Sequence, residues 1–299
     1  MARAERSIIT IEAFRDSMAK DTRNREKPAP ARKAGTASRA PAAAKPRPMA
    51  KPKAAPDGKR VTLPRALSKL GFCSRTQAEV LIAEGRVALS GRTVTEPETW
   101  IDLTEAVITV DGKPVVAEAR LYLMLNKPRG LVTTRHDPEG RPTVFDCLKD
   151  FADAHLSPVG RLDKASEGLL LFTNDTDFAN ALLDPATHVA KTYHVQMDRI
   201  ADDAVLAALE AGVHHDGEFL RARAVRKLRE GEKNSWLEIT LDEGRNRQIR
   251  RMLEALGIEC LRLMRVSIGN LQLGELEKGA VRALTEAEMK DLRRLIRRG

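Results

Sequence analysis

The sequence has 299 residues, 42% of them hydrophobic, and a formal net charge of +9, a length and composition that suit two folded domains of an ordinary soluble protein. It contains no run of about 18 apolar residues that would span a membrane, and no apolar N-terminal stretch like that of a secretory signal. The three cysteines are far apart and lack metal-ligand spacing, which indicates neither a disulfide framework nor a zinc site. We therefore expect a cytoplasmic protein without a metal.

The positive charge is concentrated in residues 1–59. This stretch carries 15 Lys/Arg and 6 Asp/Glu, which leaves 36 basic and 36 acidic residues in the rest of the chain. It is rich in Ala and Pro and has few apolar residues to offset chain entropy, so we predict a disordered tail with only a brief helix at residues 8–18. A basic arm that binds RNA phosphates, a solubilising leader and an organelle transit peptide are the open interpretations, although early acidic residues disfavour the last.

Two helices and a hairpin are predicted after residue 60. Apolar residues recur at helical spacing over residues 63–70, and Ser74 and Gln77 have the spacing of a capping box that starts a second helix. Residues 86–94 have the pattern of a short hairpin. This small unit carries six basic residues that form either a phosphate-binding patch or a solvated face. They are Arg60, Arg65, Lys69, Arg75, Arg86 and Arg92.

One acid, Asp163, lies in a polar loop directly before the apolar run 169–172, which has the length and boundaries of a buried strand. Arg161 and Lys164 flank it, and neighbouring cations favour the ionised form of a carboxylate. This setting suits a nucleophile. An Asp in a loop that contains glycine is also a common turn residue, so the loop alone leaves both interpretations open.

Two later segments carry further candidate residues. Residues 191–195 alternate like a strand and contain Tyr193, whose ring could stack on a displaced base or fill a core. Residues 248–256 have helical periodicity, and four arginines crowd the start of this helix. Nearby acids are too few to neutralise them all, so we expect some to face phosphates or a catalytic carboxylate; a solvated basic face is the alternative. The four are Arg245, Arg247, Arg250 and Arg251.

The remaining pattern predicts an apolar strand at residues 121–125, turns and the start of a helix over 137–148, and a short helix near 178–183. We further predict a helix at 202–210, a half-buried strand at 235–241, one or two strands within 261–284, and a last amphipathic helix capped by Thr285.

Four motifs occur in order behind the small unit: LNKPRGLVTT, GRLDKASEGLLLFTND, KTYHV and EGRNRQIRRMLEALG. Together they resemble the RsuA-like family of ribosomal-RNA pseudouridine synthases, and residues 60–107 resemble the S4 RNA-binding domain. Small departures from the family patterns occur at Ser90, Ser166 and Thr176.

The resemblance implies an α+β fold. A small S4 domain of two helices and a hairpin is expected to precede a catalytic domain built on a mixed, largely antiparallel sheet flanked by helices. The expected division is a basic tail at residues 1–59, the S4 domain and a linker at 60–118, and the catalytic domain at 119–299.

The resemblance also implies the activity, which is site-specific isomerisation of uridine to pseudouridine in ribosomal RNA. The uridine must be flipped out of its helix into a pocket, and no cofactor or metal is expected. The catalytic Asp of the family falls on Asp163, the conserved Tyr on Tyr193 and the arginine that pairs with the Asp on Arg250, with Arg161 and Lys191 in supporting positions. Expected RNA contacts of the catalytic domain are Lys127, Arg245, Arg247 and Arg251.

The expected partner is ribosomal RNA or a pre-ribosomal particle, bound by a monomer, with large-subunit RNA favoured by the segment DPEGRPTVFD. Three alternatives stay open from the sequence. They are the same chemistry on small-subunit RNA, a non-catalytic factor of ribosome assembly, and a general RNA chaperone that acts through the tail.

Overall fold

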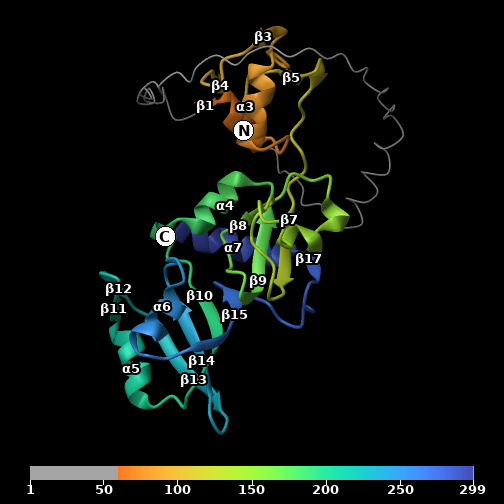
Figure 1. The fold of residues 1–299 in the computed structure, drawn as a ribbon. Helices are drawn as coiled ribbons and strands as arrows, with labels where there is room; N and C mark the ends of the chain where they lie inside the picture. Colours follow the sequence, from red (N-terminus) through yellow and green to blue (C-terminus); the bar gives the residue numbers. More distant parts are fainter. Residues whose placement is uncertain (1–59, 299) are drawn as a thin grey trace, which may run out of the picture.

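The computed structural model describes residues 60–298, so the predictions for residues 1–59 lie outside the described part of the chain. Figure 1 shows a small unit, β1 to β6, at one end of the molecule and a larger sheet-based unit, β7 to α7, beside it. Among the described residues, no helix is long and apolar enough to cross a membrane.

The small unit contains both predicted helices and the predicted hairpin. Helices α2 (Leu63–Lys69) and α3 (Arg75–Ala83) pack on each other over one apolar core. Ser74 Oγ accepts a hydrogen bond from Gln77 N at 3.1 Å, and Ser74 N donates to Gln77 Oε1 at 3.0 Å, which confirms the capping box. The strands are β1 (Arg60–Thr62), β2 (Val87–Leu89), β3 (Arg92–Val94), β4 (Trp100–Asp102), β5 (Ile108–Val110) and β6 (Lys113–Pro114), with the sheet order β3-β2-β5-β6 and a separate β1-β4 pair.

A mixed sheet organises the large unit, in the order β13-β14-β10-β15-β9-β7-β17, with β8 beside β9 and β16 beside β15. Its pairs are antiparallel except for β15 and β9, which run parallel. The predicted fold class, α+β with a mixed and largely antiparallel sheet, is confirmed. The strands are β7 (Tyr122–Lys127), β8 (Ser157–Val159), β9 (Ser166–Thr173), β10 (Lys191–Met197), β13 (Ala224–Glu230), β14 (Ser235–Leu241), β15 (Cys260–Ile268), β16 (Leu271–Gln272) and β17 (Val281–Ala283).

Helices cover both faces of this sheet. Because successive side chains of a strand point to opposite faces, the central strand β9 contributes to two cores. Leu169 and Leu171 pack on the face covered by α4 and α7, whereas Leu170 and Phe172 pack on the face covered by α5 and α6. The helices are α4 (Thr176–Leu183), α5 (Asp203–Ala211), α6 (Gln248–Ala255) and α7 (Glu286–Arg298).

Several features differ from the sequence predictions, among them the short strands β1, β4, β5, β6 and β8, which were not predicted. The helix expected to start before residue 148 is two short 3-10 turns, η2 (Val144–Cys147) and η3 (Lys149–Phe151). The hairpin of β11 (Val213–His215) and β12 (Glu218–Leu220) and the edge strand β13 were not predicted. β13 is mostly exposed and rich in charged residues, as edge strands often are, and this composition hides the strand pattern.

The two units touch where α2 meets α4. Lys69 Nζ lies 2.7 Å from a carboxylate oxygen of Asp177, and Glu118 N donates to Leu70 O at 2.9 Å. Arg120, on the large-unit side of the junction, is buried and donates to Asn174 O at 2.9 Å. The ion pair joins the two units, and the two hydrogen bonds attach the connecting segment to one unit and then to the other.

Candidate active site

Asp163 lies in the loop between β8 and β9, three residues before β9 begins. Its side chain is 35% exposed and lines a cavity of about 280 Å³. The buried run that follows in β9 fixes the end of the loop, because both faces of β9 are packed. The predicted arrangement, an acid presented by a loop ahead of a buried strand, is present.

The first sequence motif holds the backbone of this loop. Thr133 Oγ1 donates to Leu162 O at 2.7 Å, and Gly130 N donates to Lys164 O at 2.7 Å. Lys127 Nζ reaches the carbonyl of Asp163 itself at 3.2 Å. Because peptide groups on both sides of the acid are bonded to the same neighbouring segment, the carboxylate is presented from a fixed loop.

Lys127 was predicted to contact RNA, and the structure contradicts this prediction. The side chain is 0% exposed, and its ammonium group also donates to Pro128 O at 3.1 Å and to Ser166 O at 2.8 Å. Burial lowers the pKa of Lys127 to about 8, although the nearby carboxylates of Asp163 and Glu167 raise it. A lysine in this position organises carbonyl groups of the loop and has no surface to offer a phosphate.

The arginine beside Asp163 is Arg247, which was predicted as an RNA contact. Its Nη1 lies 3.9 Å from Asp163 Oδ2, and its side chain is 53% exposed. Arg247 is the N-cap of α6 and has left-handed backbone angles, with φ 48°. Such a conformation is uncommon for a residue with a side chain and often marks a functional turn. The turn directs this guanidinium toward the mouth of the cavity.

Arg250 was predicted to pair with Asp163, but the structure shows no ion pair between these two side chains, both of which it describes. Arg250 lies almost one helical turn after Arg247 and donates to two backbone carbonyls, Cys260 O at 3.1 Å and Ala165 O at 3.4 Å. Because Ala165 belongs to the Asp163 loop, Arg250 holds the loop backbone in this structure, and Arg247 is the cation near the acid.

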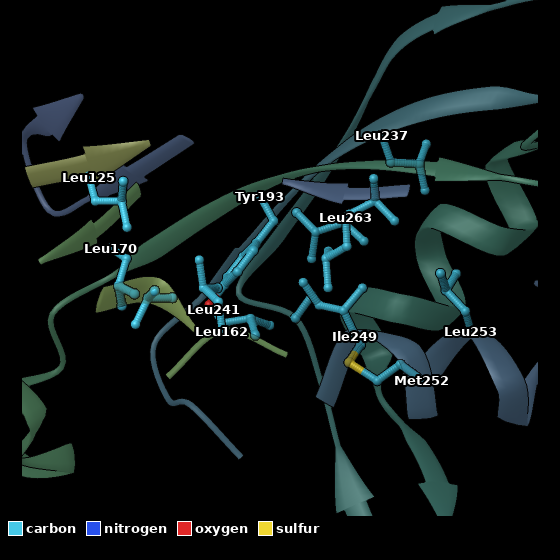
Figure 2. Close-up of a cluster of buried hydrophobic side chains, with 14 of the residues drawn as sticks. Leu125, Leu162, Leu170, Tyr193, Leu237, Leu241, Ile249, Met252, Leu253 and Leu263 are labelled. Atoms are coloured by element: carbon cyan, nitrogen blue, oxygen red, sulfur yellow. The ribbon is translucent and has the colours of Figure 1, made fainter. Parts of the chain in front are cut away.

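Tyr193 and Lys191 both line the cavity, side by side on one face of β10. Figure 2 shows the Tyr193 side chain among apolar residues, near Leu162, Leu241 and Ile249. Burial, together with the charge of Arg265, lowers the pKa of Lys191. The cavity therefore combines apolar side chains and one aromatic ring with polar and charged groups, among them the half-buried Lys191.

Four polar residues of the cavity were not predicted as site residues: Ser166, Asn246, Gln248 and Arg265. Ser166 and Arg265 are the ones whose side chains have buried atoms that are unpaired within the described part of the chain. Ser166 and Arg265 are almost fully buried, at 1% and 4% exposure. Ser166 was noted only as a departure from a family pattern, and Arg265 was read only as part of a strand. An available signal was the charge of Arg265 within an otherwise half-buried strand, because buried charges are rare without a partner or a role.

The other basic residues predicted around the site are placed differently from one another. Arg161 is exposed and lines the cavity. Arg245 also lines it, and donates to Glu243 Oε2 at 2.9 Å. Arg251 faces away from the cavity, where it pairs with Glu218 at 3.0 Å and is largely buried. Two of these three side chains thus line the cavity, and of the two only Arg161 makes no ion pair with another described residue.

The basic residues of the small unit also fall into two groups. Lys69 is paired with Asp177 across the junction, and Arg86 is paired with Asp111 at 2.6 Å, which reduces their attraction for phosphate. The other four are exposed and make no ion pair with another described residue. These exposed S4 arginines are Arg60, Arg65, Arg75 and Arg92.

Comparison with known protein families gives two matches. Residues 57–104 match the S4 domain, and residues 121–255 match the family described as RNA pseudouridylate synthase. The second match includes the Asp163 loop, Tyr193 and Arg250.

Individual relatives are similar over most of their length. Ribosomal large subunit pseudouridine synthase B of Bacillus subtilis is 38% identical over 239 residues, which cover 79% of this chain and 97% of that protein. The protein of the same name from Haemophilus influenzae is 37% identical, with 75% of this chain and 67% of that protein covered. A solved structure, described as the crystal structure of pseudouridylate synthase, is 30% identical with a TM-score of 0.56, and the match covers 78% of this chain and 99% of that chain.

Proposed function

Because the chain belongs to the RNA pseudouridine synthase family and carries an S4 domain, we propose that it isomerises a specific uridine of large-subunit ribosomal RNA. The relatives from Bacillus subtilis and Haemophilus influenzae are named for that subunit, and the segment DPEGRPTVFD favours the same choice. We further propose that the enzyme acts as a monomer in the cytoplasm, on ribosomal RNA or a pre-ribosomal particle.

One observation carries the proposed chemistry. The Asp163 carboxylate and Tyr193 line the same cavity, and the acid is held by backbone contacts with Arg247 nearby. At about 280 Å³ the cavity lies at the small end of ligand sites, which begin near ~300 Å³. That size suits one flipped base and not a stretch of stacked RNA.

The reaction breaks the bond from ribose C1′ to uracil N1 and forms a bond from C1′ to C5. The bonding electrons leave with the ring, the detached base turns, C5 loses its proton and N1 gains one. An ionised Asp163 assists the departure of the base, as carboxylates do in other glycosidic chemistry. Tyr193 stacks on the ring and is positioned to help remove the C5 proton. Arg247 places a positive charge beside the acid, 3.9 Å from Asp163 Oδ2.

The rest of the protein offsets the energy of flipping the uridine, which is roughly a few kcal/mol. Phosphate contacts supply this energy, because each neutralised phosphate releases counterions. We assign the contacts to the exposed S4 arginines in the small unit, and to Arg161 and Arg245 at the cavity.

The test maps pseudouridines in both ribosomal RNAs by carbodiimide treatment and primer extension, in cells with and without the gene. We expect one site in the large-subunit RNA to disappear with the gene and to return with the wild-type gene. If the site that disappears lies in the small-subunit RNA, that RNA is the substrate and the large-subunit proposal is wrong. If no site disappears, the protein is not the enzyme, and a role as a non-catalytic assembly factor is favoured.

A rescue experiment assigns the nucleophile. Asp163→Asn should bind the RNA but restore no pseudouridine, because an amide cannot act as the nucleophile. Asp153→Asn, which changes an exposed aspartate away from the cavity, should restore it fully. Restoration by Asp163→Asn would refute the assignment of Asp163.

A further inference from the structure

Three buried polar side-chain atoms have no hydrogen-bond partner among the described residues, and all three surround the Asp163 loop. They are Ser166 Oγ, Arg250 Nε and Arg265 Nη2. Buried polar groups are nearly always paired, and an unpaired one costs about 1–3 kcal/mol. A cluster of such atoms at one place therefore indicates groups kept for a ligand.

Strand pairing brings two of these atoms to one wall of the cavity, which we call the floor and which consists of Ser166, Lys191 and Arg265. β15 lies between β9 and β10, so that Arg265 is in register with Gly168 on one side and with Tyr193 on the other. Arg265 Nε donates a hydrogen bond to Leu169 O at 2.7 Å. This bond fixes the guanidinium group, and Nη2 remains a donor without a partner among the described residues. Both Arg265 and Ser166 line the cavity that Asp163 and Tyr193 share.

Two cationic side chains, Lys191 and Arg265, also line the cavity. Burial and the charge of Arg265 lower the pKa of Lys191, whereas the carboxylate of Asp242 raises it. Neither cation makes an ion pair with a described carboxylate, and the Lys191 ammonium is bonded to a backbone carbonyl, Val189 O, at 3.0 Å. A buried arginine and a half-buried lysine, neither of them in a direct ion pair with a described residue, favour a bound group that is negative or becomes negative.

We propose that Arg265 Nη2 and Ser166 Oγ bind the carbonyl edge of the flipped uracil and that Arg265 and Lys191 stabilise the negative charge of the ring while it is detached. This inference rests on the proposed function. When the bond from C1′ to N1 breaks, both electrons remain on the ring and spread onto O2 and O4. Donors and cations placed where charge develops are among the largest contributions to catalysis.

The geometry of uracil suits this floor before and after the ring turns. A half-turn about the axis through N3 and C6 exchanges N1 with C5 and O2 with O4. The edge therefore presents acceptor, donor and acceptor in both orientations. An arginine donor that faces one carbonyl oxygen in the substrate faces the other in the product, so one fixed pair can hold the base throughout.

The same floor would select uridine over cytidine. Cytosine has an amino group where uracil has O4. Two hydrogen-bond donors, this amino group and the Arg265 guanidinium, would then face each other, and neither could be satisfied. Sites built around a specific hydrogen bond reject analogues that leave buried groups unpaired.

The experiment uses the full chain and a transcript of the large-subunit RNA around the mapped uridine. Single-turnover rates are measured for wild type, Ser166→Ala, Arg265→Lys and Arg265→Gln, and binding is compared for transcripts with U or C at the target. We expect the rate to fall about tenfold for Ser166→Ala and about 100-fold for Arg265→Gln, with Arg265→Lys between them because it keeps the charge. The preference for U over C should fall about tenfold in Ser166→Ala and Arg265→Gln.

Thermal unfolding separates recognition from structural support. Ser166→Ala removes an unpaired hydroxyl, so its Tm should equal or exceed that of wild type while its rate falls. The matched controls Ser267→Ala and Arg120→Lys change a buried serine and a buried arginine that do not line the cavity, and their U over C preference should be unchanged. If an Arg265 variant does not fold, Ser166→Ala decides.

The outcomes distinguish this inference from the proposed function. A wild-type protein that forms no pseudouridine in the transcript refutes the proposed function and, with it, this inference. The other outcome is that the wild-type protein forms pseudouridine and Ser166→Ala has the same rate and the same preference for U over C as wild type. That outcome overturns the floor proposal and leaves the proposed function in place.

Discussion

The small and the large unit use basic side chains in opposite ways. The exposed S4 arginines extend into solvent with no ion pair among the described residues. In the large unit, Lys127, Arg250 and Arg265 are withdrawn from solvent and bonded to backbone carbonyls around the Asp163 loop. Phosphate binding tolerates mobile and redundant charges, whereas bond breaking requires groups fixed in advance. The difference indicates that the small unit supplies affinity and the large unit supplies geometry.

The largest effect is expected where two strands approach most closely. A Cβ on Gly168 would lie 2.2 Å from Arg265 O, and Gly168 has φ +97°. Gly168→Ala should therefore lower the free energy of unfolding by on the order of 4 kcal/mol, through backbone strain and overpacking together, and should abolish activity. Urea denaturation measures this change.

Gly112→Ala is the matched control, because Gly112 also has positive φ, +75°, but nothing lies within 4 Å of its Cβ position. We expect a loss of about 1 kcal/mol from backbone strain alone. Equal losses in the two variants would contradict the view that close contact of β9 and β15 fixes the site.

The pH dependence of stability tests the burial of Lys127. Its pKa is about 8 in the folded protein, below the ordinary 10.5, so the unfolded chain binds the proton more tightly. The free energy of unfolding should therefore rise as the pH increases from about 8 to 10.5, by up to about 3 kcal/mol, and this rise should be absent in Lys127→Met. Urea denaturation at several pH values provides the curves.

Lys290→Met, at an exposed position on α7, should follow the wild-type pH curve. Parallel curves for Lys127→Met and wild type would show that Lys127 keeps an ordinary pKa and is not the buried organiser of the loop.

The two arginines near the acid should differ in kind. Arg250→Ala removes contacts to Ala165 O and Cys260 O, so we expect a rate about 100-fold lower together with a lower Tm. Arg247→Ala changes an exposed side chain, and we expect a rate about tenfold lower with an unchanged Tm. Single-turnover kinetics and thermal unfolding measure both, with Arg229→Ala on the edge strand β13 as control. A wild-type rate in Arg250→Ala would refute the role given to Arg250.

Local patterns in the sequence predicted much of the fold. The capping box of α3, the buried run in β9 and the alternation of β14 depend on neighbours within a few residues, and the structure contains all three. The edge strand β13 has no such local signature. The domain division between residues 118 and 119 stays a prediction.

The sequence predicted individual residues of the site but not the contacts between them. Asp163 was assigned through the resemblance of four motifs to a family, because the loop alone left both interpretations open. The position of Arg247 depends on a left-handed turn at the start of α6, and the burial of Lys127 depends on carbonyls more than 30 residues away. Arg265 enters the site only through the pairing of β15 with β9. These relations are tertiary and leave no pattern within one segment.

The smallest effects are expected in the small unit, where the contacts are redundant. Arg65→Ala and Arg75→Ala should each weaken RNA binding a few-fold and lower the slope of log K against log salt by about one, without changing the single-turnover rate at saturation. Arg86→Ala should change the slope less, because Asp111 already neutralises this side chain. Filter binding at several salt concentrations measures the slopes. If Arg65→Ala or Arg75→Ala slowed the saturated rate instead, the small unit would contribute geometry as well as affinity, and the division of labour between the units would fail.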